Sequence, residues 1–211
     1  MHFKLQFILS LFLRYSKFHF IINKINELLK SHTSTKERLA FYPKFKNIVK
    51  KINPNSILDL GCGLNPIALS NFFPNTFYYA YDIKKEDILL VEKFFKKNNI
   101  NGKLFIADIR KVENFPKADL TLILKTLDII DTKNHFISKS ILKNIECKYF
   151  IISFSTHTLS GKPMNFPRRA WFENILKELN FKFAIIKSKN EVFYVAEKNK
   201  LTSLELSTRK L

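Results

Sequence analysis

Cysteine and glycine are both scarce in this chain of 211 residues, which has two cysteines and four glycines. Two cysteines do not make a disulfide framework or a metal cluster, so we expect no metal site. Cys62 and Cys147 are expected to be small packing residues in a reducing compartment, the cytoplasm. The few glycines and seven prolines argue against long disordered stretches. The length and the 46% hydrophobic content favour one globular domain with a sizeable core.

The chain also lacks a hydrophobic run long enough to span a bilayer. Its most apolar stretch, residues 3–13, is too short for that purpose. Arg14 and Lys17 follow it, where the cleavage site of a signal peptide would need small residues. We therefore expect one or two basic amphipathic helices within residues 3–30, packed on the domain, with a helix lying on a membrane surface as the alternative. No membrane partner is expected.

Acidic residues are few: 18 of them face 36 Lys and Arg, which gives a net charge of +18. Such an excess suggests a polyanionic partner, most simply nucleic acid. A genome rich in A and T would also enrich lysine, so the distribution of charge matters. Residues 1–55 contain eleven Lys and Arg and only two acids, which places +9 in about a quarter of the chain. This concentration of charge favours a polyanionic partner, because a compositional bias of the genome would spread lysine evenly along the chain.

Alternating strand and helix patterns predict a doubly wound α/β fold with a mostly parallel, seven-stranded sheet. A polar break at residues 31–38 contains a helix start, and that helix is expected to end near Lys51. Strands are predicted at 56–60, 77–82, 103–108, 118–124, 149–154, 181–188 and 191–197. Helices are predicted at 66–73, 84–97, 134–146 and 168–179. The expected divisions are a basic helical extension (1–52), the main domain (53–198) and a basic, frayed tail (199–211).

The first predicted strand runs into a glycine-containing turn, residues 57–66, with the sequence ILDLGCGLNP. Gly61 and Gly63 permit backbone angles closed to other residues and let a ligand approach the main chain. Asp59 is placed to organise the turn, and Pro66 suits a first helical turn. No third glycine follows, so this is not the dinucleotide-binding fingerprint. An ordinary strand–turn–helix junction is the alternative to a cofactor site.

Two further acids end the next two predicted strands. Asp82 lies about twenty residues beyond the glycines, a spacing that places a carboxylate against ribose hydroxyls. Asp108 lies at the end of the third strand, where an adenine amino group would be. In an open α/β sheet the ligand binds beyond the carboxyl ends of the strands, so the acids and the glycine turn are expected to meet there.

The turn resembles motif I of the class I S-adenosylmethionine (SAM) methyltransferases. More narrowly, the chain resembles the aminoglycoside-resistance 16S ribosomal RNA methyltransferases, the Arm/Rmt or FmrO-like family, over roughly residues 32–197. The segments that carry the resemblance, besides residues 56–69, are HTSTKER (32–38), YAYDI (79–83), LKTL (124–127), IISF (151–154), TLSGK (158–162) and WFE (171–173).

This resemblance implies methyl transfer from SAM to N7 of a guanine in the decoding site of the small subunit. It implies that Arg38 pairs with the SAM carboxylate and that Lys125 positions the target. The implied cofactor-binding set is Arg38, Asp59, Gly61, Gly63, Asp82, Ile83, Asp108, Ile109 and Leu124. The implied substrate-binding set is Ser153, Ser160, Gly161, Lys162, Arg168 and Arg169. Ribosomal RNA, within the assembled small subunit, is the implied partner.

Some features of the chain depart from that family's pattern. Only about thirty residues precede the HTSTKER segment, and residues 126–128 (TLD) and Ser155 differ from the usual sequence beside the target pocket. Two other functions therefore stay open: a SAM methyltransferase of another RNA site or of a protein, and a SAM-fold RNA-binding module without catalysis.

Overall fold

The computed structural model describes residues 27, 29–30, 33–70, 72–131, 134–158 and 160–199. The basic helices predicted within residues 3–30 and the tail predicted at 199–211 fall almost entirely outside these ranges. No helix among the described residues is both long enough and apolar enough to cross a bilayer.

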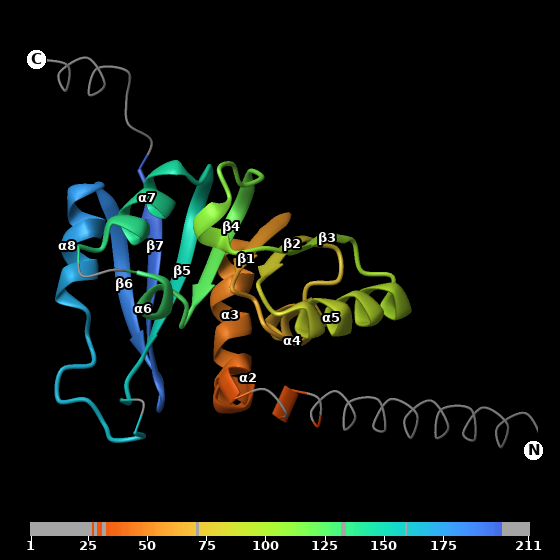
Figure 1. Ribbon diagram of the computed structural model, residues 1–211, viewed down its shortest axis with the longest axis horizontal. Coiled ribbons are helices and arrows are strands. Elements are labelled where there is room, and N and C mark those ends of the chain that lie inside the picture. The colour runs from red at the N-terminus through yellow and green to blue at the C-terminus, as the bar shows by residue number, and fades with distance from the viewer. Residues whose placement is uncertain are drawn as a thin grey trace, which may run out of the picture.

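One seven-stranded sheet forms the centre of the molecule, with strand order β3-β2-β1-β4-β5-β7-β6 (Figure 1). The strands are β1 (Ser56–Leu60), β2 (Phe77–Asp82), β3 (Gly102–Ile106), β4 (Ala118–Leu124), β5 (Cys147–Ser155), β6 (Phe181–Lys187) and β7 (Glu191–Lys198). β1 to β5 pair in parallel, and β7 is antiparallel to β5 and β6. The prediction of a doubly wound, mostly parallel sheet with a closing hairpin is confirmed.

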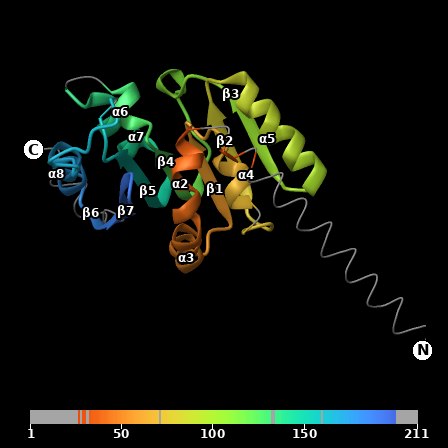
Figure 2. The same ribbon diagram turned by 90° about the horizontal axis from the view of Figure 1, so that it is seen from below.

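Helices cover both faces of the sheet because its central strands are apolar on both faces. Neighbouring residues of a strand point to opposite faces, so Ile57 and Leu58 of β1 belong to two different buried clusters. One cluster joins the sheet to α3 (Tyr42–Ile52), α4 (Asn65–Ser70) and α5 (Lys85–Asn98). The other joins it to α7 (Phe136–Asn144) and α8 (Ala170–Glu178). Figure 2 shows the two helical layers from below.

The helix predicted before the first strand is present, but it is divided into three parts. They are α2 (Thr33–Arg38), a 3-10 turn η1 (Leu39–Phe41) and α3. Pro43 lies in the first turn of α3, where a backbone N–H has no partner within the helix. Proline is therefore tolerated there and favours the start of a new helix. Asn53, with φ 51°, ends α3 in the left-handed conformation.

Several predicted boundaries differ from the structure. β3 ends at Ile106 rather than at Asp108, because Asp108 caps a 3-10 turn, η2 (Ile109–Lys111), by accepting a hydrogen bond from the Arg110 N–H. α4 ends at Ser70, three residues earlier than predicted. A short helix that the sequence pattern did not predict, α6 (Leu127–Ile130), follows β4. η2 and α6 follow β3 and β4 along the chain, so they lie beside the carboxyl ends of those strands.

Candidate functional site

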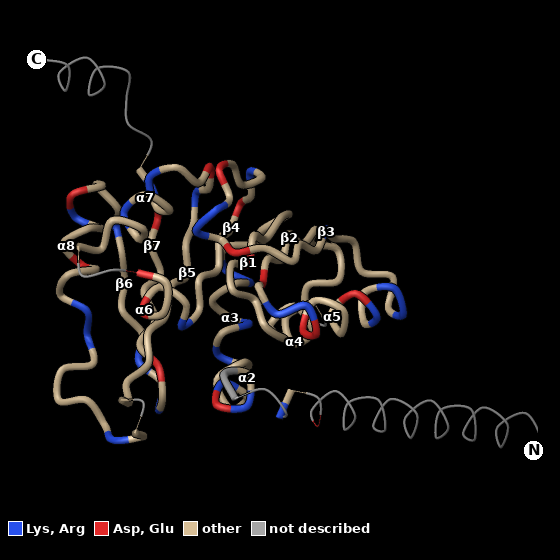
Figure 3. Tube along the Cα trace, viewed as in Figure 1, with Lys and Arg blue, Asp and Glu red and all other residues tan. Residues whose placement is uncertain are grey.

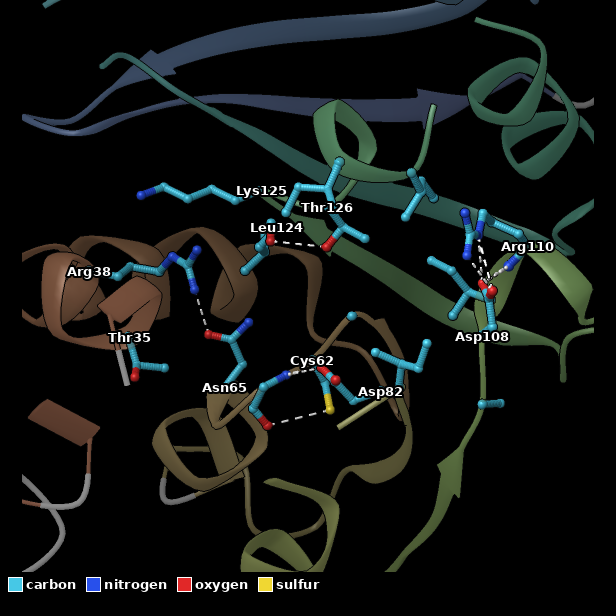
Figure 4. Close-up of a pocket in the computed structure, with 17 residues that line it drawn as sticks. Thr35, Arg38, Cys62, Asn65, Asp82, Asp108, Arg110, Leu124, Lys125 and Thr126 are labelled. Atoms are coloured by element: carbon cyan, nitrogen blue, oxygen red, sulfur yellow. Dashed lines mark hydrogen bonds and ion pairs between the residues drawn. The ribbon is translucent and has the colours of Figure 1, made fainter. Parts of the chain in front are cut away.

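A cavity of about 320 Å³ lies at the carboxyl ends of β1, β2 and β4 (Figure 4). Its volume lies within the range typical of small-molecule sites. It brings together eight of the nine predicted cofactor-binding residues: Arg38, Gly61, Gly63, Asp82, Ile83, Asp108, Ile109 and Leu124. Asp59 does not line it. Residues from α2, three strand ends and α6 therefore meet where the topology places a ligand.

Hydrogen bonds from the glycine turn tie it to the end of β2. Gly61 and Gly63 have φ of 68° and 47°, in the left-handed region. The N–H groups of Gly61 and Cys62 both donate to the Tyr81 carbonyl, at 2.8 and 3.0 Å. The Gly63 N–H donates to Oδ2 of Asp82 at 2.8 Å. Asp82 thus fixes the turn and also presents its carboxylate to the cavity.

Gly61 is required by a close neighbour as well as by its φ. A Cβ at this position would lie 2.5 Å from Oγ1 and 2.8 Å from Cγ2 of Thr126. The Thr126 hydroxyl lies within hydrogen-bonding distance of the carbonyls of Leu60 and Leu124, at 3.3 and 3.2 Å. Thr126 therefore joins the ends of β1 and β4 directly over the turn, and sequence reasoning did not identify it as a site residue.

Asp59 has a different position from the one predicted. Its side chain is completely buried, and neither carboxylate oxygen forms a well-aligned hydrogen bond with a described residue. The N–H groups of the turn go instead to Tyr81 and Asp82. Burial raises the pKa of Asp59 to about 8, while the Arg38 charge acts to lower it. Asp59 is thus a protonated core residue near neutral pH.

Arg38 reaches the cavity from the last residue of α2 (Figure 4). A fixed set of partners holds its guanidinium. Nε and Nη2 donate to the carboxylate of Glu191 at 3.1 to 3.2 Å, and Nη1 donates to Oδ1 of Asn65 at 2.6 Å. The Tyr42 hydroxyl donates to the same Asn65 oxygen at 2.8 Å. Burial acts to lower the pKa of Arg38, but Glu191 and Tyr42 together outweigh burial and leave the pKa raised. Arg38 is therefore a permanently charged, oriented cation.

Asp108 lines the cavity and is paired within its own turn. Arg110 Nε and Nη2 donate to its carboxylate at 2.6 to 3.1 Å. These hydrogen bonds lower the pKa of Asp108 to about 2, so the carboxylate stays ionised. Arg110, two residues further on, also lines the cavity and was not among the predicted site residues.

A second, larger cavity of about 1090 Å³ adjoins the first, and the two share Lys125 and Ile129 as wall residues. Lys125 has a left-handed φ of 56°, and its N–H donates to the backbone carbonyl of Ser153 at 3.0 Å. Its Nζ contacts Glu37 and lies 3.6 Å from Oε1 of Glu191. Lys125 therefore stands at the boundary between the two cavities.

The structure brings only part of the predicted substrate-binding set to this second cavity. Gly161 and Arg169 line it, together with Lys125. Ser153 is fully buried and supports the backbone of Lys125 instead. Ser160 and Lys162 bond Thr158 within their own loop and do not line the cavity. Arg168 pairs with Glu173 of α8.

Arg169, from the implied substrate-binding set, and Trp171, from the WFE segment, already have partners inside the protein. Arg169 pairs with Asp128 of α6 at 2.8 Å. Trp171 stacks on His135 with ring centroids 3.8 Å apart and an angle of 5° between the planes. The described residues contain no group of three or more His, Cys, Asp or Glu side chains that could hold a metal ion.

Sequence reasoning missed Asn65 and Glu191 as well as Thr126. Asn65 follows the glycine turn at the start of α4, and its polar side chain in an apolar run was the available signal. Glu191 starts β7, far from Arg38 in sequence, so no local pattern could pair the two residues.

Comparison with known proteins places the chain in a family. A family model described as ribosomal RNA methyltransferase (FmrO) matches residues 20–195. The 16S rRNA (guanine(1405)-N(7))-methyltransferase of Micromonospora echinospora is 26% identical over 182 residues, which cover 82% of this chain and 66% of that protein. The chain spans just under two thirds of the length of such curated relatives.

Solved structures agree with this comparison. The structure of the 16S rRNA methylase ArmA has a TM-score of 0.68 and 30% identity, with 83% of this chain and 91% of that chain covered. The methyltransferase RmtF, crystallised with S-adenosyl-L-homocysteine, shares the fold with a TM-score of 0.73 and 24% identity, covering 83% of this chain and 68% of its own. The family match spans most of the chain and includes both cavities, so this protein belongs to the ribosomal RNA methyltransferase (FmrO) family.

Proposed function

We propose that this protein transfers a methyl group from SAM to N7 of a guanine in 16S ribosomal RNA. One observation carries the proposal: the cavity at the glycine turn, lined by Arg38, Asp82 and Asp108, opens beside a second and larger cavity. The curated relatives are named as 16S rRNA (guanine(1405)-N(7))-methyltransferases, which supports the same reaction here.

The residues of the first cavity fit SAM. Arg38 donates from Nε and from one N–H of each terminal nitrogen to Glu191 and Asn65. The second N–H of each terminal nitrogen is assigned to the SAM carboxylate, because a guanidinium pairs well with a carboxylate. We assign Asp82 to the ribose hydroxyls and Asp108, beside Arg110, to the adenine amino group. The apolar side chains of Ile83, Ile109, Leu124, Ile129 and Ile130 supply the walls for a flat ring.

The second cavity takes the target nucleotide in this proposal. Bound SAM supplies an electrophilic methyl group on its sulfonium. Guanine N7 has a lone pair and no proton, so the attack requires no general base, and catalysis rests on placing N7 in line with the methyl group. The nucleotide leaves its stack to enter the cavity. Lys125, at the boundary between the cavities, positions the nucleotide or its phosphate.

The basic N-terminal part belongs to the same proposal. We assign residues 1–52 to contact with the assembled small subunit and residues 53–198 to the methyltransferase domain, in the cytoplasm where ribosomes are found. Figure 3 shows Lys and Arg along α2 and α3. α3 contains Lys44, Lys46, Lys50 and Lys51 and no acid, so it is suited to contact with RNA phosphates.

Incubation with labelled SAM tests the proposal. Small subunits, naked ribosomal RNA and whole ribosomes are offered separately, and the labelled nucleotide is mapped. We expect incorporation at a guanine N7 of 16S RNA. Asp82→Asn should abolish most of it, whereas Glu92→Gln on the surface of α5 makes the same chemical change and should not. Absence of label from every RNA would refute the proposal, and label in another RNA or at another atom would correct the substrate.

A further inference from the structure

Arg169 lines the second cavity and forms several hydrogen bonds there. It lies at the end of segment 156–169, which connects β5 to α8, and only 11% of its side chain is exposed. Nη2 donates to Oδ2 of Asp128 at 2.8 Å and to the Ser155 carbonyl at 3.1 Å. Nε donates to Oδ1 of Asp128 at 3.4 Å. Nη1 donates to the Pro167 carbonyl at 2.8 Å and lies 3.6 Å from Sδ of Met164.

These contacts use every N–H of the guanidinium. An arginine has five such donors: one on Nε and two on each terminal nitrogen. In Arg169 the Nε–H group faces Asp128. The two N–H groups of Nη2 face Asp128 and Ser155, and the two N–H groups of Nη1 face Pro167 and Met164. The guanidinium carbon also lies 5.4 Å from the centroid of the Phe154 ring. To bind a phosphate, Arg169 would have to give up contacts that it already makes.

The partners of Arg169 come from three separate parts of the cavity wall. Asp128 is on α6, Ser155 ends β5, and Met164 lies in the connecting segment; all three line the second cavity. The backbone of Arg169 is fixed as well, because its N–H donates to the Tyr194 hydroxyl at 2.9 Å. One side chain therefore joins the wall that follows β4 to the wall that follows β5.

We propose that Arg169 is a positioning residue that fixes the walls of the second cavity through Asp128 and Ser155, and that it does not itself bind RNA phosphate. This inference rests on the proposed function, because that cavity is the one assigned to the target nucleotide. Loosening the wall displaces the target from its in-line position, a kind of error that costs about 100-fold in rate for a displacement of about 1 Å. The SAM cavity is affected less, because it shares only Ile129 and Ile130 of α6 with this wall.

The test uses the full chain and three variants: Asp128→Asn, Arg169→Gln and the double variant. Glu178→Gln is the matched control, because Glu178 forms an exposed ion pair with Lys139 that joins α7 to α8 away from the cavity. We expect both single variants to lower kcat/KM for RNA about 10- to 100-fold, with a much smaller change in SAM affinity. The double variant should be no worse than the worse single variant, since the two side chains act as one unit. The control should behave as the parent protein.

Binding measurements distinguish the alternative in which Arg169 binds phosphate. In that case Asp128→Asn would release the arginine and strengthen RNA binding, and Arg169→Gln would reduce the slope of log K against log salt by about 0.7 to 0.9. Either result would overturn the proposal. We expect Asp128→Asn to leave RNA affinity unchanged or weaker and Arg169→Gln to leave the slope unchanged.

Hydrogen exchange without RNA separates this inference from the proposed function. Asp128→Asn and Arg169→Gln should each increase exchange in both α6 and segment 160–168, and Glu178→Gln should increase it in neither. The measurement needs no methylation, so it decides the matter even if the protein methylates no RNA that is offered. Increased exchange in only one of the two wall segments, or in neither, would contradict a joint role for Arg169.

Discussion

The carboxylate of Glu191 holds the guanidinium of Arg38 across 153 positions of sequence. Both side chains are almost completely buried. The direction of β7 makes this contact possible. β7 runs antiparallel to β5, so its first residue, Glu191, lies opposite Ser155 at the carboxyl end of β5. A parallel strand would begin at the other end of the sheet, far from the cavity. The reversed last strand thus supplies an anion to the proposed cofactor site.

Glu191→Gln should destabilise the protein strongly. The amide keeps the shape of the side chain but removes the counterion of a buried arginine, a change that costs about 3–5 kcal/mol. Glu197→Gln, at the other end of β7, is the matched control, because its pair with Lys148 is exposed and contributes at most about 1 kcal/mol. Urea unfolding of both variants gives the comparison. Equal losses of free energy of unfolding would contradict a special role for the pair between Arg38 and Glu191.

Asp82→Ala should weaken SAM binding by about 10- to 100-fold, because it removes the acceptor of the Gly63 N–H and the proposed ribose partner together. RNA affinity should stay close to that of the parent, since Asp82 does not line the second cavity. Calorimetry with SAM and filter binding with RNA measure the two affinities. An equal loss of both would point to misfolding instead of a lost cofactor contact.

Gly61→Ala should destabilise the protein through a clash with Thr126, and Thr126→Ala should partly relieve that clash. The added Cβ meets Oγ1 and Cγ2 of Thr126, and overpacking of this kind costs about 1–3 kcal/mol. Gly61→Ala with Thr126→Ala removes both of those atoms, so thermal unfolding should show a smaller loss than the sum of the two single variants. Recovery stays incomplete, because Cβ of residue 126 lies 3.2 Å away and the left-handed φ remains. Strict additivity would show that the predicted clash does not occur.

The buried carboxyl of Asp59 predicts a pH dependence of stability with a definite sign. Its pKa is raised from 3.8 to about 8 in the folded protein. Between these values the folded state holds a proton that the unfolded state has lost. The contribution of Asp59 is therefore complete below about pH 4 and is lost as the pH rises to about 8, at up to about 1.4 kcal/mol per pH unit. Above that range it changes no further.

Asp59→Asn is the variant that isolates this contribution, since the amide cannot ionise. Urea unfolding between pH 5 and pH 9 measures the free energy of unfolding of the parent and the variant. The free energy of unfolding of the parent should fall relative to that of the variant as the pH rises from 5 to about 8. Parallel curves would show that Asp59 titrates at its ordinary pKa.

The sequence by itself determined the sheet and the core of the cofactor site. The strand and helix patterns are local, and so are the glycines between β1 and α4, the acid at the end of β2 and the acid just beyond β3. The rule that parallel strands bind ligands at their carboxyl ends then places Gly61, Gly63, Asp82 and Asp108 together without knowledge of the packing. Asp59 was misplaced because the same local pattern does not reveal which acid accepts the N–H groups of the turn.

Only the tertiary structure decided the partners of the charged side chains and the substrate side of the site. Arg38 and Glu191, like Arg169 and Asp128, are far apart in sequence, and periodicity holds no information on such pairs. α6 has four residues, too few to give a helical pattern or to be stable without tertiary contacts. The two stretches that depart from the family's pattern, residues 126–128 and Ser155, meet at the single side chain of Arg169. Such a meeting depends on packing, because it requires two strand ends and a connecting segment to come together in space.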